Sequence, residues 1–279
     1  MFWNKTRMEE IVKNALCEDL ADGGDITSHN LFSSKKRIKG YINAREEGIL
    51  AGLNIAAETF QQCSKEIKFT SQKEEGAILK AGEIIAEIEG LARDILCAER
   101  TALNFLQRLS GIATRTGQYV KVVEDFNVRI TDTRKTTPTL RMLEKYAVRM
   151  GGGHNHRFGL FDGAMIKDNH IIAAGGIKQA VKKLKQKLPH TVKIEVEVED
   201  LQEVREALAA GADIIMLDNM EPELIAEAVE LIAGRAIVEA SGGITLDSLK
   251  EVARTGVDVI SVGALTHQIN SLDIGLDFE

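Results

Sequence analysis

The sequence lacks several features that mark particular classes of protein. It has only three cysteines in 279 residues, Cys17, Cys63 and Cys97, and no two of them form a Cys-x-x-Cys pair. Neither a disulfide framework nor a zinc ribbon is therefore expected, and a reducing, cytoplasmic setting fits the thiols best. No apolar run approaches the ~20 residues that cross a bilayer, so we expect no association with a membrane.

An overall excess of positive charge is also missing, because the formal net charge is −7. Nucleic acid needs a basic footprint, so it is not expected as a partner. One segment reverses the balance: residues 129–170 contain eight Arg or Lys against four Asp or Glu. Arg141, Lys145 and Arg149 have helical spacing and predict a solvent-exposed basic helix face. The other cations lie in loops or at strand ends and indicate a local anion-binding site.

The second half of the sequence repeats an apolar run, a helical stretch and a glycine. This order predicts βα units, and the missing dinucleotide-binding glycine fingerprint favours an α/β barrel over an open sheet. Six segments are expected as its parallel strands: 128–131, 163–167, 192–198, 213–217, 236–240 and 257–262. In the first hundred residues, short strands within 39–50 and 67–89 precede a long helix that starts at Asp94. They predict a small α+β domain ahead of the barrel.

The basic segment begins directly after a predicted strand, at the rim where barrel active sites form. Arg134 and Lys135 would enter the mouth of the barrel there, and an unpaired buried charge is costly, so a bound anion is their natural partner. Further on, three glycines at 151–153 let the backbone pass close to a ligand. Arg157 follows them with a planar fork that suits a carboxylate.

Two residue types in this segment allow more than one interpretation. Lys167 ends an apolar strand, and such a lysine either forms a Schiff base, as in barrel aldolases, or holds a phosphate as a point charge. The histidines His154, His156 and His170, with Asp168, could instead bind a metal ion, although no helical His-Glu-x-x-His spacing supports this. For His154, a purely structural hydrogen bond is an equal alternative.

Charged side chains alternate along one predicted strand, at Lys193, Glu195, Glu197 and Glu199. Alternation places these side chains on one face, which in a barrel points inward. Carboxylates in that position need cations or a metal. Asp218 supplies a further acid at the end of the next strand, and Glu197 with Asp218 would suit magnesium held partly through substrate oxygens.

The last two predicted strands end in small residues, Ser241-Gly242-Gly243 and Gly263. Loops in these positions of a barrel commonly bind a phosphate through backbone N–H groups. Together with the basic segment, they suggest a phosphorylated substrate.

These motifs, in this order and spacing, closely resemble those of the quinolinate phosphoribosyltransferases, the carboxylating nicotinate-nucleotide pyrophosphorylases. The resemblance runs over nearly the whole chain and is carried by 18–27, 98–104, 133–136, 149–157, 166–170, Glu197, 217–219 and 239–244. It implies an incomplete, seven-stranded α/β barrel over residues 111–279. A small α+β sandwich domain with a long connecting helix would precede it over residues 1–110, and the extreme C-terminus would pack back on that domain. The seventh strand comes from the resemblance alone.

The resemblance also implies an enzyme of NAD biosynthesis. It would transfer the phosphoribosyl group of phosphoribosyl pyrophosphate to quinolinate with decarboxylation, giving nicotinate mononucleotide, pyrophosphate and CO2. Quinolinate would be bound by Arg100, Thr133, Arg134, Lys135, His156, Arg157 and Lys167. Phosphoribosyl pyrophosphate would be bound by Lys135, Lys167, Glu197, Asp218, Ser241, Gly242, Gly243 and Gly263. Lys135, Lys167, Glu197 and Asp218 would be catalytic, and Glu197 and Asp218 would hold Mg²⁺, partly through substrate and water. The chain would form a homodimer, or a hexamer built as a trimer of dimers, with Arg100 contributed across the interface.

Four alternatives stand beside this one. Nicotinate phosphoribosyltransferase has a related barrel and one substrate carboxylate fewer, but the excess of cations here favours a dicarboxylate. A relative associated with molybdenum transport shares the glycine-rich His-Arg pattern, but the intact segment 166–170 argues against it. An aldolase would use Lys167 as a Schiff base. A non-enzymatic anion-binding module would leave the acidic strand face at 195–199 without a purpose.

Overall fold

The computed structural model describes residues 4–279, which form two compact units. The first comprises the residues up to Gly117 together with Thr136–Gly152 and Leu265–Glu279. The second comprises Gln118–Lys135 and Gly153–Ala264. Each unit is described by itself below. None of the helices within residues 4–279 combines the length and the apolar character that crossing a membrane would require.

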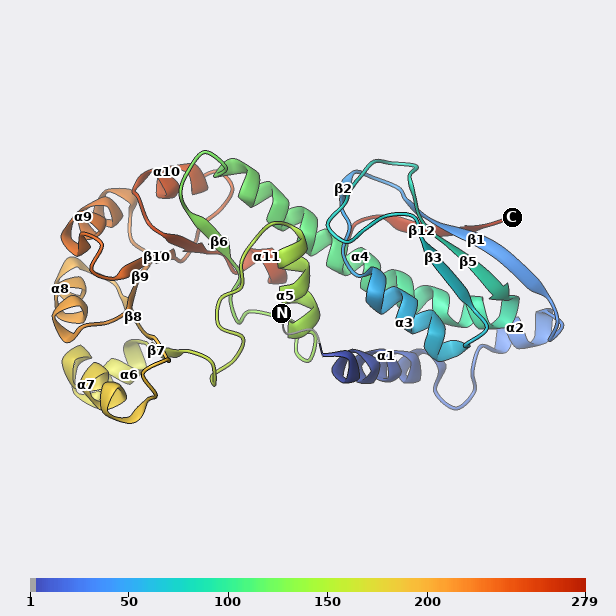
Figure 1. Cartoon of the computed structure of the whole chain (residues 1–279), viewed down its shortest axis with the longest axis horizontal. Helices are drawn as coiled ribbons and strands as arrows, with labels where there is room; N and C mark the ends of the chain where they lie inside the picture. Colours follow the sequence, from blue (N-terminus) through green and yellow to red (C-terminus); the bar gives the residue numbers. More distant parts are fainter. Residues whose placement is uncertain (1–3) are drawn as a thin grey trace. The chain divides into compact units, whose positions relative to one another are not determined.

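The first unit contains a four-stranded antiparallel sheet in the order β12-β1-β5-β3. Its strands are β1 (Arg37–Ala44), β3 (Lys68–Ser71), β5 (Ile84–Leu91) and β12 (Ile274–Phe278). A smaller antiparallel pair joins β2 (Gly48–Ile49) to β4 (Ile78–Leu79). The short strands expected in the first hundred residues are confirmed, and a strand from the end of the chain completes the larger sheet (Figure 1).

Helices and sheet of the first unit bury one apolar cluster. The helices are α1 (Lys5–Leu20), α2 (Ile26–Leu31), α3 (Leu53–Cys63), α4 (Ala92–Val122) and α5 (Arg141–Met150). Side chains from both kinds of element meet in the cluster, among them Ile42, Phe60, Ile88 and Leu106, all fully buried. Burial of such side chains contributes about 1.5–3 kcal/mol each. The long helix predicted from Asp94 is confirmed and starts two residues earlier.

Helix α5 carries only part of the solvent-exposed basic face that its spacing predicted. Lys145 is only 3% exposed, and the residues from Met142 to Val148 are all buried. The fully buried Glu144 accepts hydrogen bonds from Arg108 Nε at 3.0 Å and Nη2 at 2.6 Å. Arg149 is exposed and Arg141 is partly exposed, as the spacing predicted. Tertiary packing has enclosed Lys145, so the prediction was wrong for this residue.

The second unit is a six-stranded parallel sheet in the order β6-β11-β10-β9-β8-β7. Its strands are β6 (Arg129–Thr131), β7 (Ala164–Ile166), β8 (Ile194–Val198), β9 (Ile214–Asp218), β10 (Ile237–Ser241) and β11 (Val259–Ser261). The helices of this unit are α6 (Asp168–Ala174), α7 (Ile177–Lys187), α8 (Leu201–Ala210), α9 (Pro222–Ile232) and α10 (Leu249–Arg254). The short helix α11 (Ala264–His267) follows β11, and all of it after Ala264 belongs to the first unit. Figure 1 shows α8 and α9 along the outer side of β8 and β9. All six predicted strands are confirmed.

A seventh strand is reduced to a single residue in the described part of the chain. His154 forms an isolated parallel bridge with Thr131 of β6, on the side of β6 away from β11. His154 N–H donates to Ile130 O at 2.8 Å, and Asp132 N–H donates to His154 O at 3.2 Å. Within residues 4–279 no ladder joins β6 to β7, so the barrel is incomplete.

Candidate active site

The carboxyl ends of the parallel strands bring most of the predicted site residues of the second unit to one edge of the sheet. Glu197 lies in β8, Asp218 and Ser241 end β9 and β10, and Lys167 and Gly263 follow β7 and β11. Parallel strands share a direction, so side chains at these ends are neighbours. Arg100 is different: it lies exposed on α4 in the first unit.

The segment after β6 is anchored by a buried acid. Asp132 is completely buried, and its Oδ1 accepts the backbone N–H of His156 at 2.9 Å. Its Oδ2 accepts Nδ2–H of Asn155 at 2.7 Å. Beyond it, Thr133 Oγ1 accepts the backbone N–H of Lys135 at 3.0 Å. The hydrogen bonds of Asp132 therefore tie the loop that carries His156 to the end of β6, a role that its sequence position did not reveal.

Lys167 and Glu197 form an ion pair between the end of β7 and the neighbouring strand β8. Lys167 Nζ contacts Glu197 Oε2, and the two side chains are 41% and 16% exposed. The pair places the strand-end lysine against one of the inward-facing carboxylates of β8. The expectation that this strand face meets cations inside the barrel is confirmed at this position.

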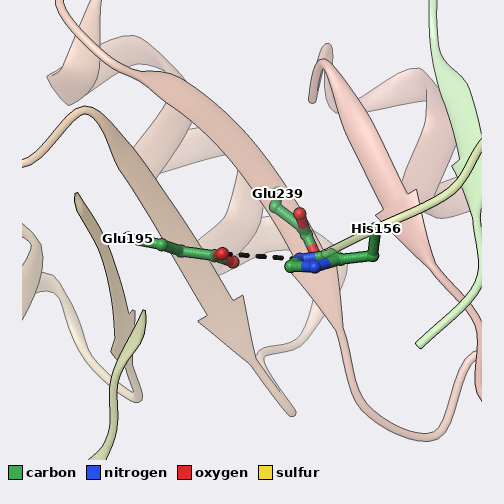
Figure 2. A group of neighbouring side chains, drawn as sticks. All are labelled: His156, Glu195 and Glu239. Carbon is green, nitrogen blue, oxygen red and sulfur yellow. Dashed lines mark ion pairs between the residues drawn. The ribbon is translucent and has the colours of Figure 1, made fainter. Parts of the chain in front are cut away.

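The second inward-facing carboxylate of β8 belongs to a buried cluster of three side chains, which Figure 2 shows with His156 between Glu195 and Glu239. His156 Nε2 lies 3.4 Å from Glu195 Oε2 and 3.3 Å from Glu239 Oε1. The exposed fractions of the three side chains are 12%, 5% and 4%. His156 comes from the loop after the isolated bridge, Glu195 from β8 and Glu239 from β10.

Two groups of this cluster, His156 and Glu195, have shifted pKa values. Burial of the ring tends to lower the pKa of His156, but hydrogen bonds to Glu195 and Glu239 and their charges outweigh it and raise the pKa to about 10. Burial raises the pKa of Glu195, against the effect of its hydrogen bond with His156. The backbone N–H of Arg157 donates to His156 Nδ1 at 2.7 Å, so the ring is contacted on this side as well.

Arg157 lies directly beside this cluster. Its Nη1–H donates to Gly163 O at 3.0 Å, and its Nη2 lies 3.4 Å from Met165 Sδ. Burial lowers the pKa of Arg157, and the nearby Arg134 adds to this effect. Two guanidinium groups that repel each other are stabilised when an anion binds between them, which agrees with the predicted carboxylate-binding role.

The loops after β9 and β10 interlock around Asn219. Its backbone has a φ of 55°, its N–H donates to Ser241 O at 2.9 Å, and its Nδ2–H donates to Asp218 Oδ2 at 2.7 Å. A Cβ on Gly242 would lie 2.3 Å from Asn219 Oδ1. Glycine at position 242 is thus required for the two loops to approach each other this closely. This role of Asn219 was not predicted, although asparagine is one of the residues that tolerate a left-handed backbone.

One group of three side chains in the described part of the chain has the spacing of a metal site: His156, Glu195 and Glu239, with ligand atoms within 4.8 Å of one another. Magnesium prefers oxygen and water ligands, so the imidazole fits it poorly. Glu197 and Asp218, at the ends of neighbouring strands, offer carboxylate oxygens and fit better. The alternative site of His154, His156, His170 and Asp168 is not found among residues 4–279.

Comparison with known proteins decides the family. The model described as "Quinolinate phosphoribosyl transferase, N-terminal domain" matches residues 25–110, and the one described as "Quinolinate phosphoribosyl transferase, C-terminal domain" matches residues 112–277. The chain belongs to the quinolinate phosphoribosyltransferase family. The resemblance carried by the sequence motifs is thereby confirmed.

Relatives of this quinolinate phosphoribosyltransferase family cover nearly the whole chain. A probable carboxylating nicotinate-nucleotide pyrophosphorylase of Bacillus subtilis is 48% identical over 98% of this chain and 94% of its own length. A chloroplastic enzyme of that name from Arabidopsis thaliana is 40% identical over 98% of this chain and 83% of its own. The solved structure of the Francisella tularensis nicotinate-nucleotide pyrophosphorylase matches with a TM-score of 0.95 and 43% identity, over 99% of this chain and 98% of that one.

Proposed function

We infer that the chain is a decarboxylating quinolinate phosphoribosyltransferase of NAD biosynthesis. It transfers the phosphoribosyl group of phosphoribosyl pyrophosphate to quinolinate and releases nicotinate mononucleotide, pyrophosphate and CO2. The observation that carries this inference is the match of both family domains, with 48% identity to a relative over 98% of the chain.

We propose that the basic residues bind the quinolinate and the pyrophosphate group. Arg134, His156 and Arg157 hold the two carboxylates, and Lys135 and Lys167 lie toward the pyrophosphate. Thr133 supports this group through its hydrogen bond with the backbone of Lys135. The repulsion between Arg134 and Arg157 supports the proposal, because a dianionic substrate relieves it.

The acidic residues serve the ribose in this proposal. When pyrophosphate leaves the anomeric carbon, positive charge develops on the sugar, so Glu197 and Asp218 stabilise the transition state. Lys135 and Lys167 stabilise the leaving group. Ser241, Gly242, Gly243 and Gly263 bind the 5′-phosphate through their backbone. The reaction therefore depends more on charged side chains held in the right positions than on a strong base.

Decarboxylation follows from the same substitution. Attachment of the ribose to the ring nitrogen makes that nitrogen positive, and the carbanion left by CO2 at the neighbouring carbon is stabilised beside it. The site has to hold both substrate carboxylates in place and exclude water during this step. The arginines of the basic group meet the first requirement.

Magnesium is the metal that this donor set fits. We propose that Glu197 and Asp218 hold Mg²⁺, partly through substrate oxygens and water, as carboxylates at a magnesium site commonly do. The ion, when bound, neutralises charge on the pyrophosphate.

We also propose a homodimer, or a hexamer built as a trimer of dimers, in which Arg100 of one chain completes the site of the other. Its exposure on α4 agrees with such a role. For the compartment we propose the cytoplasm. The small number of cysteines, with no Cys-x-x-Cys pair, supports a reducing compartment.

One assay tests the proposed reaction. The protein is mixed with MgCl2, phosphoribosyl pyrophosphate and either quinolinate or nicotinate, and mononucleotide formation is followed. We expect turnover of quinolinate only. Turnover of nicotinate without turnover of quinolinate would show that the chain takes the monocarboxylate.

A further inference from the structure

Two buried carboxylates inside the barrel have no place in the roles proposed above. Glu195 and Glu239 are 4% and 3% exposed, and they lie on β8 and β10, on either side of β9. A buried carboxylate without a compensating partner is costly, and apolar side chains of similar size would pack there at lower cost. Lys167 pairs with Glu197 instead, so it does not compensate them.

The partner of both carboxylates is the same atom. His156 Nε2 lies 3.4 Å from Glu195 Oε2 and 3.3 Å from Glu239 Oε1, within ion-pair distance of both (Figure 2). Among residues 4–279, neither Glu195 Oε1 nor Glu239 Oε1 has a hydrogen-bond partner. An arrangement that leaves a buried oxygen unsatisfied suggests that the two acids are kept for their effect on the ring.

The other side of the ring holds the backbone of a substrate-binding residue. His156 Nδ1 accepts the N–H of Arg157 at 2.7 Å. The backbone N–H of His156 donates to the buried Asp132 at 2.9 Å. The imidazole is therefore a link from the carboxylates of β8 and β10 to the backbone that carries the Arg157 guanidinium, and the ring is contacted on both sides.

We propose that Glu195 and Glu239 are positioning residues for quinolinate binding: they fix the ring of His156 and, through its Nδ1, the backbone of Arg157 in the orientation that the substrate carboxylates meet. This inference rests on the proposed quinolinate-binding role of His156 and Arg157. It also explains why two acids can lie buried close to a site for a dianion. Their carboxylates interact with the ring of His156 and not with the substrate.

The first test removes each contact and compares the two substrates. We expect Glu195→Ala and Glu239→Ala to raise KM for quinolinate roughly 10- to 100-fold, the range for loss of a buried hydrogen bond to a charged group. KM for phosphoribosyl pyrophosphate should change less than about twofold, and Glu239→Gln, which keeps an acceptor oxygen, should recover much of the loss. Glu199→Gln, at an exposed position just beyond the end of β8, is the matched control and should leave both KM values unchanged.

A double-variant cycle decides whether the acids act through the ring. In a His156→Ala background, Glu239→Ala should cause no further rise in KM for quinolinate, because the link is already broken. Additive effects, or equal changes in both KM values, would overturn the inference. An inactive wild-type chain would instead overturn the proposed function.

A spectroscopic measurement keeps the test valid if the alanine variants do not fold. In a ¹H–¹⁵N spectrum of the wild-type protein, we expect the His156 Nε2 proton to be protected from exchange with water. The Glu195→Leu, Glu239→Leu double variant keeps a similar side-chain volume, removes both acceptors and should lose this protected signal. Retention of the signal together with an unchanged KM for quinolinate would contradict the positioning role.

Discussion

The guanidinium of Arg157 is held from the side of β7, through Gly163 O and Met165 Sδ. Its planar fork retains N–H donors for a carboxylate beyond these contacts, since a guanidinium carries five. A lysine at this position would keep the charge but would lose the fork and the two contacts. The distinction between charge and geometry can therefore be measured at this residue.

For Arg157→Lys we expect KM for quinolinate to rise roughly 10- to 100-fold, the range for one lost charge-assisted hydrogen bond. Steady-state kinetics with each substrate varied in turn measure the change. Thermal stability should stay near that of the wild type, because the side chain is only partly buried. An unchanged KM would mean that charge alone is sufficient there.

Glu197 is tested by the loss of charge at constant size. In the account above it stabilises positive charge on the ribose, so Glu197→Gln should lower kcat by about 10²–10³-fold, as for removal of one preorganised electrostatic group. Single-turnover rates with saturating substrates measure the chemical step. Glu199→Gln should retain full activity; if both variants behave alike, the effect is not specific to Glu197.

At the residue scale, the sequence predicted where charged side chains lie but not which of them form pairs. The alternation along β8 placed Glu195 and Glu197 inside the barrel, and both are indeed paired with cations there. Which cation pairs with which acid depends on how side chains from β7, β10 and a loop are brought together in the folded protein. The sequence pattern of a single strand does not contain this information. The buried anchor Asp132 was likewise visible in the sequence only as one acid among the cations.

At the scale of elements, the glycine loop after β10 depends on the loop after β9. Gly242 has a φ of +93°, and a Cβ there would also lie 2.8 Å from the backbone nitrogen of Asn219. Gly243, the next residue, has a φ of +60° and nothing within 4 Å of such a Cβ. Substitutions at these two glycines therefore distinguish the effect of steric contact from the effect of backbone strain.

We expect Gly242→Ala to destabilise the protein by about 2–4 kcal/mol and to raise KM for phosphoribosyl pyrophosphate, since strain and contact act together. Gly243→Ala should cost only about 1 kcal/mol, from strain alone. Chemical denaturation and steady-state kinetics of both variants measure these effects. Equal losses in the two variants would argue against the interlocking of the loops.

The six strands of the second unit could be predicted because each combines β-branched apolar runs with regular βα spacing. The seventh could not, since His154 contributes a single bridged residue after three glycines and has no strand-like pattern. For α5, the helix was predicted but the burial of Lys145 was not. The buried Glu144 is paired with Arg108, a residue of α4 that lies 36 positions earlier in the chain.

At the scale of the whole molecule, the proposed sharing of sites predicts complementation between chains. A chain with Arg100→Ala and a chain with Lys135→Ala should each be inactive as homodimers. A hybrid dimer contains one site with both residues intact, so mixing and refolding the two chains should recover activity. Recovery is measured against each variant refolded alone, and its absence would place Arg100 outside the partner's site.

The central claim is that one site both forms the glycosidic bond and removes a carboxylate. Quinolinate labelled with ¹³C in the carboxylate next to the ring nitrogen tests it most directly, with phosphoribosyl pyrophosphate and MgCl2 present. We predict one labelled CO2 for each pyrophosphate released, and unlabelled nicotinate mononucleotide as the product. Pyrophosphate release with the label retained in the mononucleotide would contradict the account.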